Sequence, residues 1–185
     1  MKINKSKILL HICCAPCAGY LLKELEEEFD LTAYFYNPNL DSKEEHQKRL
    51  FEAEEYCEKL EIDFIKSSYD HKKWLKIVKG FENEPEGGKR CKKCFEMRLK
   101  EVAKFAKEND FNYFSTTLTV SPYKSVGVIN PIGKMMANKF GVKFLDRDFA
   151  KKDGFKKSLE ISKKEEFYRQ NYCGCEFSKQ VTSIK

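Results

Sequence analysis

No run of 18 or more apolar residues occurs in this 185-residue chain, so the sequence predicts no membrane-spanning helix. Internal repeats and long linkers are also missing, and the length is that of one domain, expected over residues 1–185. Apolar residues make up 41% of the chain and aromatic residues 14%, which excludes intrinsic disorder and collagen-like repeats. We therefore expect one globular domain with its own core.

Neither sign of charge dominates strongly, because 35 Lys and Arg face 29 Asp and Glu, for a net charge of +6. A polyanion such as nucleic acid suits this balance, although charge alone is weak evidence. The N-terminal segment resembles a secretory signal, but His11 and Pro16 break its apolar run and the charged segment KELEEE follows. We expect a cytoplasmic protein, in which thiols stay reduced.

Short apolar runs separated by helical patterns predict an alternating order of strands and helices. The predicted strands are Lys7–Ile12, 31–36, 62–65, 112–116 and 142–145. The predicted helices cover 17–28, the segment behind Ser42, 74–78, 91–107, and a segment that Ser121 and Pro122 open and Pro131 breaks. This order is typical of an α/β fold with a Rossmann-like parallel sheet of about five strands and helices on both faces.

Sites in such sheets form at the carboxyl ends of the strands. Cys13 and Cys14 follow the first predicted strand, and Thr116 and Thr117 close the fourth. We therefore expect these two segments to meet at one crevice.

Cysteine is the most informative residue type, with eight in the chain. Cys57 stands alone on the apolar face of a predicted helix, so we expect it in the core. The other seven fall into three groups: Cys13, Cys14 and Cys17; Cys91 and Cys94; and Cys173 and Cys175. In a cytoplasmic protein such groups are typical of metal binding or redox chemistry.

Cys91 and Cys94 open a predicted helix and share one of its faces. The free amides of the first turn favour thiolates there, and so do the charges of Arg90, Lys92 and Lys93. This pair supplies half of a metal site, and the other half must come from elsewhere in the chain.

Two completions of that site are open. Cys14 and Cys17 would add a second Cys-x-x-Cys and make a four-cysteine zinc or iron–sulfur site. The adjacent pair Cys13 and Cys14 would instead suit several irons better than one tetrahedral zinc. Spacing slightly favours the first set.

Cys173 and Cys175 are separated by one glycine, so they could close only a small, strained disulfide. Gly174 allows the unusual backbone angles that such a ring needs. A redox-active dithiol is the favoured interpretation, and the alternatives are a further metal ligand or a pair without function.

Five motifs in this order resemble the epoxyqueuosine reductases of the QueH type, over residues 7–178. The motifs are His11-Ile12-Cys13-Cys14-Ala15-Pro16-Cys17, Asn37-Pro38-Asn39, Arg90-Cys91-x-x-Cys94-x-x-x-Arg98-Leu99, Thr116-Thr117-Leu118-x-x-Ser121-Pro122-x-Lys124 and Tyr168-Arg169-Gln170-x-Tyr172-Cys173-Gly174-Cys175. The resemblance implies an adenine-nucleotide hydrolase-like sheet. It also implies the last step of queuosine biosynthesis, in which tRNA epoxyqueuosine is reduced to queuosine without cobalamin.

For this family the resemblance implies a 4Fe–4S cluster bound by Cys13, Cys14, Cys91 and Cys94. It also implies a redox-active disulfide between Cys173 and Cys175, in a C-terminal segment over about 165–180. The implied partners are tRNA with a GUN anticodon carrying epoxyqueuosine and an unidentified electron donor, with no membrane. An additional iron remains open, as does the role of Cys17.

The implied reaction needs a proton donor and contacts to RNA. Candidate proton donors within the motifs are His11, Lys124 and Tyr172, although His11 also fits a buried residue that hydrogen-bonds the backbone. Tyr123 and Tyr172 could stack on the base or pack in the protein. The candidate phosphate contacts are Arg90, Lys92, Lys93, Arg98, Lys151, Lys152 and Arg169, of which the arginines are favoured.

Two other functions stay open from the sequence. A tRNA thiolase that cleaves ATP would need a glycine-rich loop after the first strand, and no glycine follows that strand until Gly19. A zinc-stabilised RNA-binding module would use the same cysteines without redox chemistry.

Overall fold

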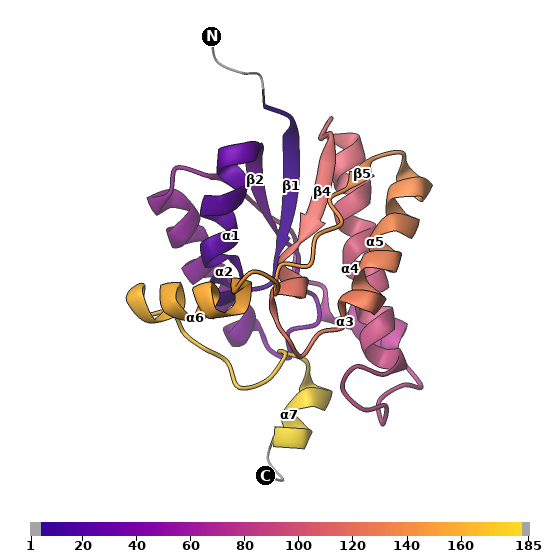
Figure 1. Ribbon diagram of the computed structural model, residues 1–185. Coiled ribbons are helices and arrows are strands. Elements are labelled where there is room, and N and C mark those ends of the chain that lie inside the picture. Colours follow the sequence, from indigo (N-terminus) through magenta and orange to yellow (C-terminus); the bar gives the residue numbers. More distant parts are fainter. Residues whose placement is uncertain (1–4, 183–185) are drawn as a thin grey trace.

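One parallel sheet forms the centre of the computed structural model, which describes residues 5–182 (Figure 1). Its five strands lie in the order β3-β2-β1-β4-β5, and every neighbouring pair is parallel. The strands are β1 (Lys7–Ile12), β2 (Asp30–Phe35), β3 (Asp63–Lys66), β4 (Tyr113–Thr116) and β5 (Lys143–Phe144). The predicted α/β class with a Rossmann-like parallel sheet is confirmed.

Helices cover both faces of the sheet. They are α1 (Ala15–Glu28), α2 (Lys43–Lys59), α3 (His71–Val78), α4 (Lys89–Glu108), α5 (Val126–Phe140), α6 (Gly154–Lys164) and α7 (Glu176–Thr182), with a 3-10 turn η1 (Thr117–Val120). Helices α1 and α2 lie on one face, with α6 against α1, and α3, α4 and α5 lie on the other. Among the helices of the described residues, none has the length and apolarity needed to cross a membrane.

Strand β1 lies in the middle of the sheet and is buried on both sides, as a central parallel strand must be. Ile8, Leu10 and Ile12 pack with α1 and α2, whereas Leu9 packs with the helices of the opposite face. Cys57 on α2 belongs to the first of these clusters and is fully buried, which confirms the prediction that it is a core residue.

The prediction of a helix that begins at Ser121 and breaks at Pro131 is wrong. A 3-10 turn and a loop occupy 117–125, and α5 runs from Val126 through Pro131 to Phe140. Pro131 is the sixth residue of α5, so its missing N–H removes only one hydrogen bond near the start of the helix.

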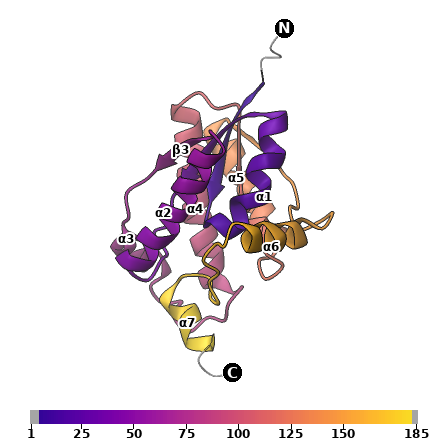
Figure 2. The same ribbon diagram turned by 90° about the vertical axis from the view of Figure 1, so that its left-hand side faces the viewer.

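The carboxyl ends of the strands lie at the lower edge of the sheet in Figure 1, where α7 also lies. Figure 2 shows α7 at the same end of the molecule, away from the N-terminus. From β1 the chain adds β2 and β3 on one side of the sheet and then returns to add β4 and β5 on the other side of β1. The strand order therefore reverses between β1 and β4. This switch point is where α/β sheets bind their ligands.

Candidate functional site

The segments that follow β1 and β4 meet at this switch point. The Cys13 amide donates to Thr117 Oγ1 at 3.3 Å, and the Thr117 hydroxyl lies 3.5 Å from Cys13 Sγ. The prediction that Cys13-Cys14 and Thr116-Thr117 share one crevice is therefore confirmed.

Cys13, Cys14 and Cys17 form a compact thiol group, with all three Sγ atoms within 4.8 Å of one another. Cys14 is the N-cap of α1, and Cys17 lies in its first turn. Hydrogen bonds from Cys14 and Cys17 hold the pKa of Cys13 well below its usual range, and the hydrogen bond to Cys13 raises the pKa of Cys17 to about 12. One shared negative charge on three sulfur atoms is suited to binding a soft metal.

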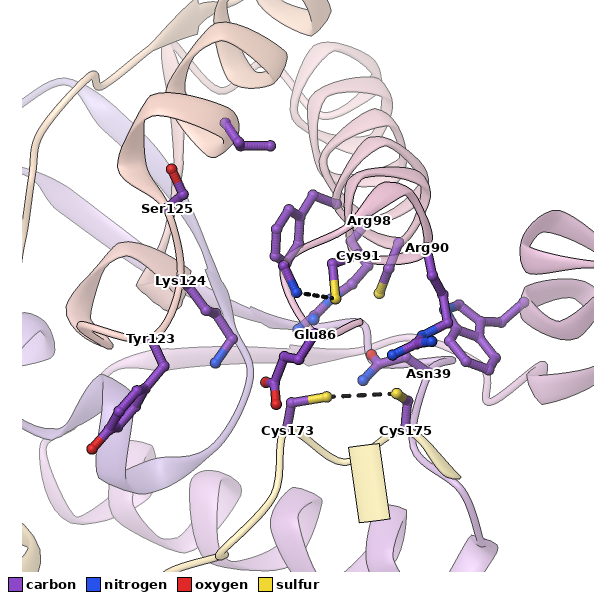
Figure 3. Close-up of a pocket in the computed structure, with 15 residues that line it drawn as sticks. Asn39, Glu86, Arg90, Cys91, Arg98, Tyr123, Lys124, Ser125, Cys173 and Cys175 are labelled. Atoms are coloured by element: carbon purple, nitrogen blue, oxygen red, sulfur yellow. Dashed lines mark hydrogen bonds between the residues drawn. The ribbon is translucent and has the colours of Figure 1, made fainter. Parts of the chain in front are cut away.

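Cys91 and Cys94, on the first turns of α4, line a pocket together with Cys173 and Cys175 (Figure 3). The pocket is partly open to solvent, and its empty space, open solvent included, amounts to about 580 Å³. The Gly87 amide donates to Cys91 Sγ at 3.3 Å. Burial raises the pKa of both Cys91 and Cys94, so the prediction that nearby charges and amides lower these pKa values is wrong. Desolvation outweighs them because both thiols face the protein interior.

Cys173 and Cys175 are free thiols whose Sγ atoms lie 3.6 Å apart. Cys173 Sγ also lies 3.1 Å from the Ser178 hydroxyl. The hydrogen bond with the Cys175 thiol outweighs burial and, with that of Ser178, holds the pKa of Cys173 well below its usual range. The pair therefore combines a reactive thiolate with a protonated partner, as thiol–disulfide chemistry requires.

Helix α2 and the loop before it hold the Cys-Gly-Cys segment in place. The Asp41 amide donates to the Gly174 carbonyl at 2.9 Å, and the Arg49 guanidinium donates to the Cys173 carbonyl at 3.4 Å. The Tyr172 hydroxyl donates to the Asp41 carboxylate at 3.0 Å. These contacts bring residues more than 120 positions apart in the chain to one pocket.

Lys124 links the two groups of thiols. Its half-buried side chain lines the pocket, and Figure 3 shows its ammonium turned toward Glu86 and Cys173. Burial opposes the charge, but the negative charges of Cys13, Cys17 and Cys173 raise the pKa of Lys124. Lys124 is thus a permanent cation between the compact thiol group and the pocket.

The sulfur atoms available here suit a sulfur-ligated centre. Seven thiols belong to or pack against one buried cluster of side chains, and soft thiolate ligands are typical of iron–sulfur clusters and structural zinc. A group that bridges Cys13 and Cys14 to Cys91 and Cys94 would have to span more space than a single ion, because only Cys13, Cys14 and Cys17 meet the single-ion spacing among the described residues. The donor set therefore fits a multinuclear cluster.

His11 is fully buried on β1 and cannot supply a proton as imidazolium. Its Nε2–H donates to the Tyr36 carbonyl at 3.1 Å, and the Thr116 hydroxyl donates to Nδ1 at 2.8 Å. Desolvation, followed by the charge of Arg98, lowers the pKa of His11 to about 3. The alternative of a buried, backbone-bonded histidine is therefore correct.

The prediction that Arg90 and Arg98 contact phosphates is wrong. The two residues are only 2% and 3% exposed. Arg90 donates to the carbonyls of Phe81, Glu82 and Glu84, and Arg98 donates to the Asn37 side chain. The other candidates for phosphate contacts are exposed: Lys92, Lys93, Lys151, Lys152 and Arg169.

The two candidate stacking residues differ in their surroundings. Tyr172 is half-buried and hydrogen-bonded to Asp41, whereas Tyr123 is 80% exposed at the rim of the pocket. The sequence analysis missed two further residues of the site, Arg49 and Glu86. Nothing local distinguishes Arg49 from other basic residues of α2, and Glu86 lies in a glutamate-rich loop where spacing carries no signal.

Comparisons with known proteins agree with the motifs. The family described as epoxyqueuosine reductase QueH matches residues 8–181. A protein named epoxyqueuosine reductase QueH from Acinetobacter baylyi is 42% identical over 182 residues, covering 97% of this chain and 84% of that relative. Proteins of the same name from Staphylococcus epidermidis (40% identical, 98% of this chain and 79% of the relative) and Thermotoga maritima (36% identical, 92% and 89%) match similarly.

Solved structures of more distant proteins share the fold. The U34-tRNA thiolase NcsA from Methanococcus maripaludis, solved with its 4Fe–4S cluster, superposes with a TM-score of 0.57 at 16% identity, over 98% of this chain and 65% of that chain. A predicted subunit of tRNA methyltransferase from Methanocaldococcus jannaschii gives a TM-score of 0.59 at 10% identity, over 85% and 74%. At these identities the likeness shows the fold alone.

Proposed function

This chain belongs to the epoxyqueuosine reductase QueH family, and we propose that its cysteine-lined pocket reduces the epoxide of tRNA-bound epoxyqueuosine to the cyclopentene of queuosine. The observation that carries this proposal is the meeting of Cys91, Cys94, Cys173 and Cys175 in one pocket. Four thiols of two kinds, from helix α4 and from the C-terminal segment, face the same space. A substrate bound in this pocket would lie next to thiols that can donate electrons to it.

The stoichiometry of the reaction favours Cys173 and Cys175 as the source of electrons. Conversion of an epoxide to an alkene and water consumes two electrons and two protons. Oxidation of the Cys173 thiolate and the Cys175 thiol to a disulfide releases two electrons and one proton, and water supplies the second proton, so the atoms and charges balance. The 3.6 Å between the sulfur atoms leaves a short movement to the S–S bond of about 2.05 Å. An electron donor of the cell must then reduce the disulfide again.

Cys13, Cys14, Cys91 and Cys94 are our proposed ligands of a 4Fe–4S cluster, in a reaction that needs no cobalamin. The neighbour NcsA carries such a cluster on a similar sheet, which supports the proposal. When bound, the cluster supplies one-electron transfer and a Lewis acid close to the pocket. Cys17 is the alternative ligand to Cys13. Whichever of these two cysteines does not bind the cluster has a thiol that could bind an additional iron.

The rim of the pocket suits a base in an RNA loop. Tyr123 presents an exposed aromatic ring beside Lys124, and single-stranded bases stack on such rings. Exposed basic residues outside the pocket, Arg169 among them, would then hold the phosphates of the anticodon loop. The proposed substrate is tRNA with a GUN anticodon that carries epoxyqueuosine.

Anaerobic turnover tests this function. The purified protein is incubated without oxygen with a chemical reductant and tRNA that contains epoxyqueuosine. The tRNA is then digested to nucleosides, which are analysed by mass spectrometry. We expect epoxyqueuosine to lose one oxygen atom. We also expect the protein to be brown, with a broad absorbance at about 400 nm, as is typical of thiolate-bound iron–sulfur clusters. Colourless, zinc-loaded protein that is fully active would contradict the cluster, and RNA binding without turnover would favour an RNA-binding module.

A further inference from the structure

A loop over residues 81–88, between α3 and α4, carries three glutamates with different surroundings. The Glu82 carboxylate accepts from the Gly80 amide at 3.0 Å, and the Glu84 carboxylate accepts from the Lys89 amide at 3.0 Å. Within the described part of the chain, the Glu86 carboxylate has no hydrogen-bond or ion-pair partner. Figure 3 shows it turned into the pocket, on the side of Cys173.

The backbone of the loop is held in place on both sides of Glu86, although the Glu86 side chain is exposed and its carboxylate is unpaired. The buried Arg90 guanidinium binds three carbonyls of the same loop, which holds the backbone over the pocket. A loop whose backbone is already ordered loses less freedom when it binds a ligand. The loop therefore presents an unpaired carboxylate at the mouth of the pocket.

Glu86 is the one acidic side chain among the residues that line this pocket. Partial desolvation and the negative charge of Cys173 raise its pKa, and the nearby charges of Lys124 and Arg90 offset this rise only in part. An acid at this place also repels the phosphates of an RNA substrate. A cationic group on the ligand would stabilise the Glu86 carboxylate and would offset its repulsion of the phosphates.

We propose that Glu86 is a specificity-determining residue that binds the protonated secondary amine of the substrate. This inference rests on the proposed function. In epoxyqueuosine that amine joins the 7-deazaguanine base to the epoxide-bearing ring, and an alkylamine of this kind is cationic at neutral pH. Guanine in an unmodified anticodon has no such group. Lys124 repels the cation, which leaves the carboxylate as its partner and directs the ring beyond the amine toward Cys173.

Binding measurements with Glu86→Gln test the inference without turnover. The probes are two anticodon stem-loop RNAs that differ only in carrying epoxyqueuosine or guanine. Wild-type protein should bind the first more tightly, and the substitution should weaken that binding by about 10- to 100-fold, as expected for a lost charge-assisted hydrogen bond. Affinity for the guanine RNA should stay the same or rise. Glu82→Gln, in the same loop but outside the pocket, should change neither affinity.

A second comparison identifies the group that is bound. The nucleoside 7-aminomethyl-7-deazaguanosine has the cationic amine without the epoxide ring, and its 7-methyl analogue has neither. Glu86→Gln should reduce affinity for the first and leave the second unchanged. Equal losses for both nucleosides, or for both RNAs, would overturn the inference, as would a preference for epoxyqueuosine RNA that survives the substitution. Wild-type protein that shows no such preference would instead count against the proposed function.

Discussion

Replacement of Gly174 by alanine tests whether the Cys-Gly-Cys segment must be docked in the pocket. Gly174 has φ +107°, a region in which other residues cost about 1–3 kcal/mol. An added Cβ would overlap Leu40 Cδ2 and lie 3.0 Å from Arg49 Nη1, and such overpacking costs about 1–3 kcal/mol. Alanine restricts the unfolded chain and offsets about 0.4–1 kcal/mol. We expect the docked segment to be destabilised by about 2–4 kcal/mol.

The segment can respond by opening locally, because a few hydrogen bonds to Asp41 and Arg49 hold it near the end of the chain. Alkylation under native conditions, followed by mass analysis of each cysteine, measures this opening. A cost of 2 kcal/mol corresponds to a rate about 30-fold higher at Cys173 and Cys175, since each 1.4 kcal/mol is a factor of about ten. Turnover should fall by a smaller factor, because the fraction of molecules with a docked segment changes less than the population of the open state.

Gly141→Ala is the matched control. Gly141 also has a positive φ, +68°, but no heavy atom lies within 4 Å of an added Cβ, and it is the C-cap of α5, away from the pocket. It should lower the melting temperature without changing alkylation of the C-terminal pair. Equal alkylation in Gly174→Ala and wild-type protein would refute the reasoning, because the overlap at Leu40 would then have no consequence.

Five further outcomes follow from the site. Cys91→Ala should lose its bound iron, measured by metal analysis, and Cys17→Ala should keep it if Cys13 and Cys14 are the other ligands. Cys175→Ala should keep its iron but lose turnover, because one remaining thiol cannot form an intramolecular disulfide. Alkylation of Cys173 should persist as pH falls below the ordinary titration range of cysteine near 8.5, because its pKa is lowered; a rate that collapses below that range would contradict the assignment. Arg169→Ala should reduce the slope of log affinity for tRNA against log salt by about one.

Much of the fold follows from local patterns in the sequence. Strand β1 is found at its predicted bounds, because the apolar run ends just before Pro16 in the first turn of α1. The helix predicted behind Ser42 begins there, since the Ser42 hydroxyl accepts from the Glu45 amide at 3.1 Å and caps α2. The meeting of Cys13 with Thr117 follows from the topology of parallel sheets alone, before any side chain is considered.

Features that depend on distant segments were not predictable. The role of Arg90 depends on carbonyls of the loop before α4, and a sequence pattern does not report which way a guanidinium turns. The thiol pKa of Cys91 is set by burial against the C-terminal segment, which outweighs the adjacent charges visible in the sequence. Glu86 stands out only when its neighbours' carboxylates are seen to be hydrogen-bonded.

The distribution of positive charge explains why the arginines beside the cysteines were misjudged. A buried thiolate needs a compensating cation at close range, and an arginine is always charged. The buried charge of Arg98 adds to the hydrogen bonds that lower the pKa of Cys13, and it opposes the rise in the pKa of Cys94 that burial causes, so it favours the sulfur anion in both groups. A cation committed in this way is not available to RNA. The basic residues behind the net charge of +6 therefore fall into two groups. Buried ones stabilise thiolates, and exposed ones, such as Arg169, can contact phosphates.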